Sequence, residues 1–186
     1  MDRPSASSRR LPVPGTRGAV SALPRPGWPR WPEGLEPASC PVLVANEHDV
    51  AAPPAVVWKW LWRADLWPTW FKRSSKVRFE GGPAPELGLG SRLVWQMLGA
   101  TIRVTVKVCE PPRALDWEGG ANGVHAYHTW LLEPVSGGTR VLTQETERGP
   151  LPWLLRWYLR GALHGAHRDW LESLGRVARN GPPPGA

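Results

Sequence analysis

The chain has 186 residues and a formal net charge of +7 at pH 7, a length that suits one domain, because domains of roughly 100 to 150 residues bury a core without disulfides. Its two cysteines, Cys40 and Cys109, lie in different surroundings, which argues against a disulfide framework or a cysteine metal cluster and predicts a reducing, cytoplasmic location. No apolar run approaches the roughly 18 residues of a membrane-spanning helix, and the N-terminus lacks the continuous apolar core of a signal peptide.

The first forty residues differ in composition from the rest of the chain. Residues 1–40 are rich in proline, serine and glycine and carry nearly half of the excess positive charge. With few large aliphatic side chains, this segment cannot bury enough surface to offset the entropy of ordering it, so we predict a disordered leader. The remaining charge is spread over strands and helix edges, which predicts a solvated face and no nucleic-acid site.

Residues 42–50 alternate as a half-buried strand does, with Val42, Val44 and Val50 on one face. Pro53 and Pro54 then predict the start of a short helix over 54–63, because a proline fits the first turn of a helix. We predict a second short helix after it.

The first short helix belongs to a cluster of five tryptophans between residues 56 and 71. At 100° per residue, Trp58, Leu61 and Trp62 share one side of this helix. Trp60 lies on the other side, where packing does not explain it. The cluster is too short and too interrupted by polar residues to be a membrane anchor.

About six strand-like pieces follow between residues 76 and 148. The clearest covers 101–108, where Ile102, Val104, Val106 and Val108 share one face. Glycine and proline pairs separate the pieces at spacings that leave room for hairpins only, so we predict an antiparallel sheet.

A helical period returns between residues 151 and 179. An apolar stripe on one side indicates a long amphipathic helix, and Asn180-Gly181 with the prolines behind it predicts its end and a flexible tail over 182–186. The stripe consists of Leu159, Leu163, Ala166, Trp170, Leu174 and Val177. One long helix and a sheet with one apolar face predict an α+β domain over 41–181 in which the helix covers the sheet.

Several short motifs along residues 44–180 carry a family resemblance. They are Ala52-Pro53 with Val57-Trp58 and Leu61, Trp67-Pro68-x-Trp70, Gly88-x-Gly90, Val108-x-Glu110-Pro111-Pro112 with Leu115 and Trp117, His128-x-Trp130-x-Leu132-x-Pro134, Gly138-Thr139-Arg140-Val141, Glu145 and Gly149. In order and spacing the chain resembles the SRPBCC superfamily, which includes START-like lipid-binding domains and polyketide cyclase/dehydrase-like proteins. The resemblance implies a helix-grip fold, in which a curved antiparallel sheet of six to seven strands wraps around the C-terminal helix and leaves a cavity.

Such a cavity suits a small hydrophobic ligand, such as a lipid, an isoprenoid or a polyketide-like molecule. The candidate ligand-binding residues are Trp70, Trp95, Trp117, Trp130, Trp157 and Leu163, together with His128 and Glu145. For each tryptophan, core filling and pocket wall both remain open, and so much indole could close the cavity.

His128 and Glu145 are the candidate catalytic pair. If the turn at 134–139 pairs Leu132 with Val141, His128 falls opposite Glu145 and both point inward. A neighbouring carboxylate favours the protonated imidazole, and the pair could orient a ligand hydroxyl or transfer a proton. A hydrogen-bonded core pair without chemistry is the competing interpretation.

His164 and His167 could in principle join His128 at a metal ion. Because we identify no acidic or cysteine ligand at a suitable spacing, we predict flanking helix positions for both, no metal and no cofactor.

The segment 151–161 is apolar around most of its circumference and carries Arg156 and Arg160. It is either a lid over the pocket or a surface that contacts an anionic membrane transiently to exchange a lipid. The resemblance favours the lid.

Three functions therefore remain open, and the oligomeric state is not predicted. The first is binding of a hydrophobic ligand. The second is a polyketide cyclase or dehydrase that uses His128 and Glu145, because members of that kind work largely by holding a flexible chain in place. The third is a protein-interaction module of the chaperone-activator type, for which Trp60 is the best clue.

Overall fold

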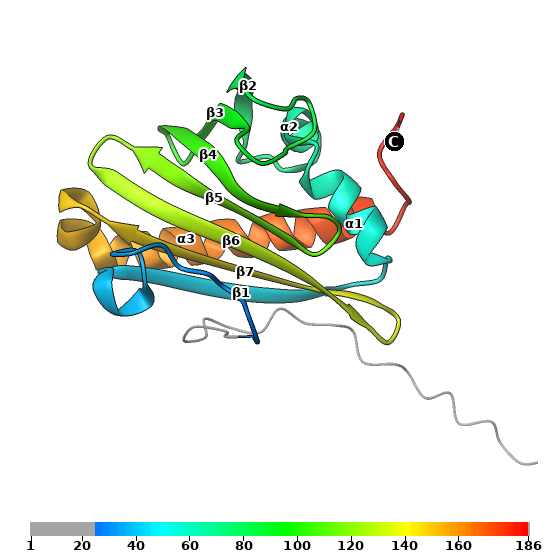
Figure 1. The fold of residues 1–186 in the computed structure, drawn as a ribbon, viewed down its shortest axis with the longest axis horizontal. Helices are drawn as coiled ribbons and strands as arrows, with labels where there is room; N and C mark the ends of the chain where they lie inside the picture. Colours follow the sequence, from blue (N-terminus) through cyan, green and yellow to red (C-terminus); the bar gives the residue numbers. More distant parts are fainter. Residues whose placement is uncertain (1–24, 186) are drawn as a thin grey trace, which may run out of the picture.

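The computed structural model describes residues 25–185, and its central feature is one seven-stranded antiparallel sheet in the order β1-β7-β6-β5-β4-β3-β2, with the long helix α3 across one face (Figure 1). This is the predicted helix-grip fold. The strands are β1 (Val42–Val50), β2 (Ser75–Gly81), β3 (Arg92–Met97), β4 (Ala100–Glu110), β5 (Ala114–Ala121), β6 (Val124–Val135) and β7 (Gly138–Arg148). The helices are η1 (Pro37–Ser39), α1 (Pro54–Leu61), η2 (Ala64–Leu66), α2 (Trp67–Trp70) and α3 (Pro150–Ala178).

Helix α3 starts and ends where the sequence predicts it. Gly149 comes before it with φ 122°, and a Cβ there would lie 2.5 Å from the carbonyl oxygen of Gly123, so the tight passage from β7 into α3 requires glycine. Pro150 and Pro152 occupy the first turn. Leu155, with φ −107° and ψ 17°, interrupts the helical geometry and separates the first turn from the rest of α3.

The main core lies between α3 and the sheet, as the apolar stripe predicts. Leu163, Ala166, Trp170 and Leu174 are buried there, and α1 and α2 cover one end. One face assignment is wrong. A register shift between Val106 and Val108 moves Val108 to a second cluster on the opposite face of the sheet, because a bulge reverses the side on which the following residues point.

Residues 25–40 lie on the face of the sheet opposite α3, so the expected disordered leader does not hold for this part of it (Figure 1). Trp28 packs against Ala114, Leu131 and Leu142. Leu35 is also buried. The rest of the predicted leader, residues 1–24, lies outside the described residues.

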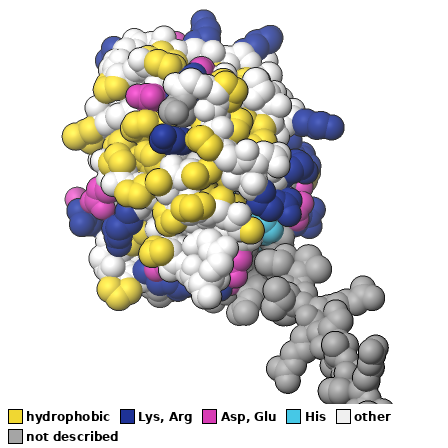
Figure 2. Space-filling view, turned by 90° about the vertical axis from the view of Figure 1, so that its right-hand side faces the viewer, with side chains coloured by type: hydrophobic (Ala, Val, Ile, Leu, Met, Phe, Trp, Pro, Cys, Tyr) yellow, Lys and Arg dark blue, Asp and Glu magenta, His cyan; other side chains and the backbone are white. Residues whose placement is uncertain are grey.

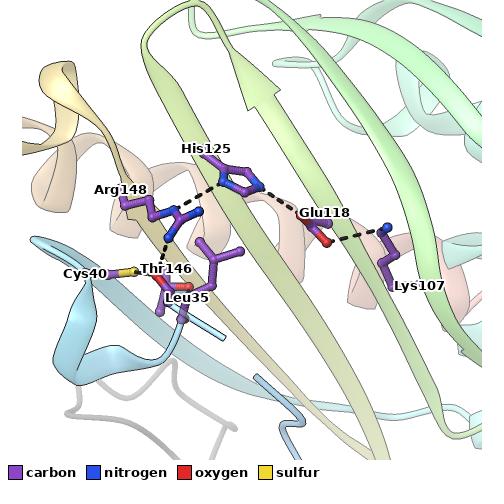
Figure 3. A network of polar contacts seen from close by, with 8 residues as sticks. Leu35, Cys40, Lys107, Glu118, His125, Thr146 and Arg148 are labelled. Atoms are coloured by element: carbon purple, nitrogen blue, oxygen red, sulfur yellow. Dashed lines mark hydrogen bonds and ion pairs between the residues drawn. The ribbon is translucent and has the colours of Figure 1, made fainter. Parts of the chain in front are cut away.

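Polar contacts connect the same N-terminal segment to the sheet (Figure 3). The Thr146 hydroxyl donates a hydrogen bond to the Leu35 carbonyl at 2.7 Å, and Arg148 Nη1 donates one to the Gly34 carbonyl at 3.3 Å. From Arg148 the network continues across neighbouring strands through His125 and Glu118 to Lys107. Side chains of the sheet therefore link the segment to several strands.

Trp60 has a partner within the chain. Its indole N–H donates to the Gly181 carbonyl at 2.7 Å, so it ties α1 to the residues that follow α3. Pro183 is buried, unlike the flexible tail that we expected from residue 182. Figure 2 shows this end of the molecule, where hydrophobic side chains gather over the middle and Lys and Arg lie mostly near the margin. The best sequence clue to a protein-interaction module is thereby accounted for.

Among the described residues, no helix combines the length and the apolar character that crossing a membrane requires.

Candidate ligand cavity and its polar end

A cavity of about 160 Å³ lies between the sheet and α3. Its wall is mostly apolar and comes from β3, β4, β5, β6, β7 and α3. Tyr158 and Leu98 are exposed members of the lining, so the cavity reaches the surface between the start of α3 and the β3–β4 turn. The lining includes Trp95, Met97, Ile102, Val104, Trp117, Ala126, Leu159, Ala162 and Leu163.

The polar lining of the cavity contains His128 from β6 and Glu145 and Glu147 from β7. The predicted register is confirmed, since His128 pairs with Glu145 across the two strands. His128 Nδ1 lies 3.5 Å from Glu145 Oε2, and both side chains are buried. The β6–β7 hairpin thus positions the two candidate catalytic residues side by side.

His167 from α3 completes the cluster. Its Nε2 donates a hydrogen bond to Glu145 Oε2 at 2.9 Å, and its ring stacks on that of His128 at 4.6 Å between centroids. We expected His167 at the flank of the helix, but it is fully buried. The sequence did contain a signal for this burial. His167 follows Leu163 by four residues and precedes Trp170 by three, which places it within the apolar stripe.

The cluster favours a neutral His128, whereas we predicted that the neighbouring carboxylate would favour the protonated ring. Burial lowers the pKa of His128 well below its ordinary value, and repulsion from His167 lowers it further. Its Nε2 lies 2.6 Å from the Thr143 hydroxyl, which can donate to the unprotonated nitrogen. In this arrangement His128 is unprotonated, and its lowered pKa makes it a weaker proton acceptor than an ordinary histidine.

Glu147 is a site residue that sequence reasoning missed. Burial, and then repulsion from Glu145, raise its pKa to about 8. Its Oε2 is buried without a hydrogen-bond partner among the described residues. The sequence could have indicated Glu147, because it lies two residues after Glu145 and residues two apart on a strand share a face. A neutral carboxyl here can donate a hydrogen bond to a ligand as well as accept one.

His128, Glu145 and His167 also have the ligand types of a metal site, with one potential ligand atom from each within 4.8 Å of the others. Two imidazoles and one carboxylate suit zinc or non-haem iron. Glu145 is the acidic ligand that the sequence search did not identify. In this structure, however, His167 Nε2 and Glu145 Oε2 form a direct hydrogen bond of 2.9 Å. For a metal ion to bind both residues, these two atoms would have to move apart. His164 takes no part, because its Nδ1 accepts a hydrogen bond from Asn46.

The predicted tryptophans divide into three groups. Trp95 and Trp117 line the cavity, as does Leu163. Trp70 and Trp130 are buried in the core outside the lining. Trp157 is 73% exposed and contributes nothing to the wall.

Aromatic rings fill part of the space inside the grip. Trp67 contacts Trp95, Trp117 and Trp170 at centroid distances of 5.6, 5.7 and 5.1 Å. Trp130 meets Trp117 and Trp170 in the same group. Indole therefore closes one part of the interior, and the cavity is the space that it leaves beside the first half of α3.

The fold agrees with a comparison to known families. The profile of the family described as polyketide cyclase / dehydrase and lipid transport matches residues 41–179. The chain belongs to this family.

Solved structures of family-like proteins support the fold. A hypothetical protein of Helicobacter pylori, jhp0584, is 24% identical with a TM-score of 0.76, covering 87% of this chain and all of its own. Protein TTHA0849 of Thermus thermophilus is 18% identical with a TM-score of 0.62, over 74% of this chain and 97% of its own. The di-domain ARO/CYC StfQ from the steffimycin biosynthetic pathway is 18% identical with a TM-score of 0.64, over 75% of this chain and 51% of its own. No curated protein sequence matches the chain.

Proposed function

We propose that this member of the polyketide cyclase/dehydrase and lipid transport family binds a small hydrophobic molecule in the cavity between the sheet and α3. The observation that carries the proposal is the cavity wall, which is mostly apolar and has His128, Glu145 and Glu147 at its polar end. Removing apolar ligand surface from water contributes about 25 cal/mol per Å², and a few polar groups orient the ligand. The fitting ligand is a lipid, an isoprenoid or a polyketide-like molecule with a hydrogen-bonding group facing these carboxyls.

The size of the cavity limits what it holds. Its volume of about 160 Å³ is close to that of an engineered cavity of about 150 Å³ that holds benzene. One ring or a short chain of the ligand fits in the present conformation. A larger ligand requires the start of α3, which contributes Tyr158, Leu159 and Ala162 to the wall, to move outward.

The direct test is native mass spectrometry of protein purified from its own host, with and without a substitution that fills the cavity. Ala162→Phe adds a ring to the wall, so we expect loss of the co-purified mass, with apolar probe affinity at least tenfold weaker. Ala55→Phe, at an exposed position on α1, adds the same ring elsewhere and is the control. Consistently empty wild-type protein, or an Ala162→Phe variant that retains the ligand, would argue against this function.

A second function, catalysis of the polyketide cyclase or dehydrase type, is favoured by the contact between His128, Glu145 and His167. A neutral imidazole and a carboxylate in one buried site can act as proton acceptors, and the cavity can hold a flexible chain in a reactive conformation. His128→Ala and Glu145→Gln separate the two functions. Retained binding of candidate polyketides with turnover lost in the variants supports the enzyme, whereas a wild type that binds without turnover supports the carrier.

We also propose a reducing cellular compartment for this protein. Cys40 and Cys109 are both free thiols, which supports a reducing environment such as the cytoplasm.

A further inference from the structure

Large hydrophobic side chains are exposed mainly at the start of α3. Of the eight that are exposed among the described residues, six lie between Leu151 and Tyr158. Leu98, in the β3–β4 turn, faces the same opening of the cavity. Only Leu89 lies apart from the opening. We call the six residues, Leu151, Trp153, Leu154, Leu155, Trp157 and Tyr158, the α3 apolar patch.

This patch is not part of a core. A helix that packs on a domain buries one stripe, yet Trp153, Leu154 and Trp157, which share one side of the helix, are each about two-thirds exposed or more. Monomeric soluble proteins rarely leave so large a contiguous apolar surface without a partner.

The charges around the patch favour an anionic partner. Residues 150–168 include Arg156, Arg160 and Arg168 and no aspartate or glutamate. Within the described part of the chain, the guanidinium groups of Arg156 and Arg160 bond to backbone carbonyls and not to carboxylates. Both remain available to phosphate groups.

The same arginines lie against the exposed indoles. Arg156 is 5.8 Å from the ring centre of Trp153 and 5.5 Å from that of Trp157, and Arg160 is 5.5 Å from that of Trp157. Tryptophan and arginine together are typical of the membrane interface, where an indole enters the head-group region and a guanidinium meets phosphate. A peptide partner would contact only one side of the helix, so it would not require apolar residues around most of the helix circumference.

The patch borders the opening of the cavity. Tyr158 belongs to both, and Leu98 flanks the opening from the sheet side. The first turns of α3 form one end of the molecule, opposite α1 and the C-terminus (Figure 1). At this end the start of α3 reaches further out than the β5–β6 turn and η1 (Figure 1), so a flat surface that approaches it meets α3 first.

We propose that the α3 apolar patch docks on the surface of an anionic lipid bilayer, with Trp153, Leu154 and Trp157 in the head-group region and Arg156 and Arg160 against phosphate. Docking presents the opening of the cavity to the bilayer. The interruption of the helix at Leu155 allows the first turn to adjust its angle to the surface. This proposal goes beyond ligand binding, and vesicle binding can be measured with empty protein.

The experiment is co-sedimentation of the full chain with vesicles of phosphatidylcholine alone or mixed with phosphatidylglycerol. We expect binding to the mixed vesicles at about 0.1 M salt, much weaker binding to neutral vesicles, and release at high salt, where charges are screened within about 3 Å. Arg156→Gln with Arg160→Gln should weaken binding about thirtyfold, at about 1 kcal/mol for each arginine near an anionic surface. Arg78→Gln with Arg103→Gln, on β2 and β4, removes the same charge elsewhere and should retain most of the binding.

The apolar contribution is tested with a matched pair of leucines. Leu154 is 67% exposed and Leu89 is 70% exposed, so Leu154→Glu and Leu89→Glu should both fold, which thermal unfolding verifies. We expect Leu154→Glu to lose binding at least tenfold and Leu89→Glu to bind nearly as the wild type does. A wild type that does not sediment with anionic vesicles, or a Leu154→Glu variant that binds like Leu89→Glu, would overturn the proposal. A dimer in solution that Leu154→Glu dissociates would also overturn it, because a second copy of the chain would then cover the patch.

Discussion

Glu147 lies on the same face of β7 as Glu145, and its protonation links the cavity to pH. The raised pKa of Glu147, about 8, means that the folded protein holds this proton at neutral pH. In the unfolded chain a glutamate loses its proton near pH 4.3. The folded state therefore binds more protons than the unfolded state between these values, and the free energy of unfolding falls as pH rises through this window.

Replacing Glu147 with glutamine removes this dependence. We expect the stability of the wild type to decline relative to Glu147→Gln between pH 5 and about 8, because one proton per molecule is released on unfolding there. Urea denaturation at several pH values measures the difference. Glu86→Gln, at an exposed position, is the control and should follow the wild type. Parallel curves for Glu147→Gln and wild type would contradict the assignment of this proton.

Local rules could predict part of the site at the scale of residues. The pairing of His128 with Glu145 follows from one short turn and strict alternation, and both are visible in the sequence. The protonation of His128 could not be predicted in the same way, because it depends on whether burial or the neighbouring carboxylate has the larger effect. His167 reaches Glu145 from another element, and only the packing of α3 on β7 brings these two together.

The N-terminal segment 25–40 is an element-scale feature that composition did not reveal. Composition averages over the segment, whereas its packing depends on two buried side chains, Trp28 and Leu35. The bulge in β4 could not be predicted either. The apolar residues alternate without interruption from Ile102 to Val108, so nothing in the sequence marks the position at which side chains change to the other face of the sheet. Long periodic elements, such as β1 and α3, could be predicted because many positions repeat the same signal.

A substitution at Trp28 tests whether this segment contributes to the fold. Trp28→Ala removes a buried indole from the cluster with Leu131 and Leu142, so we expect a loss of about 3 kcal/mol in the free energy of unfolding. Trp31→Ala, at a partly exposed position, should cost clearly less. Urea denaturation compares both with the wild type. An unchanged stability for Trp28→Ala would mean that residues 25–40 do not hold the sheet.

At the scale of the whole molecule, the cavity and the aromatic core compete for the same interior. Inward-facing tryptophans could be predicted from strand alternation, but their division between wall and filling depends on how rings from β3, β5, β6, α2 and α3 meet. The rings of Trp67, Trp117 and Trp170 pack together, and the space that remains lies beside the patch on α3. The proposed ligand entry and the proposed membrane contact therefore concern the same end of the molecule.

This shared location predicts that membranes accelerate ligand exchange. Protein loaded with a fluorescent apolar probe should release it faster when anionic vesicles are added than when neutral vesicles are added, because docking brings the opening of the cavity against the acceptor. Leu154→Glu should abolish the acceleration and leave the slow release without vesicles unchanged, since residue 154 does not line the cavity. Stopped-flow fluorescence measures both rates. Equal release rates with anionic and neutral vesicles would separate the cavity from the docking surface and would mean that the ligand leaves through water.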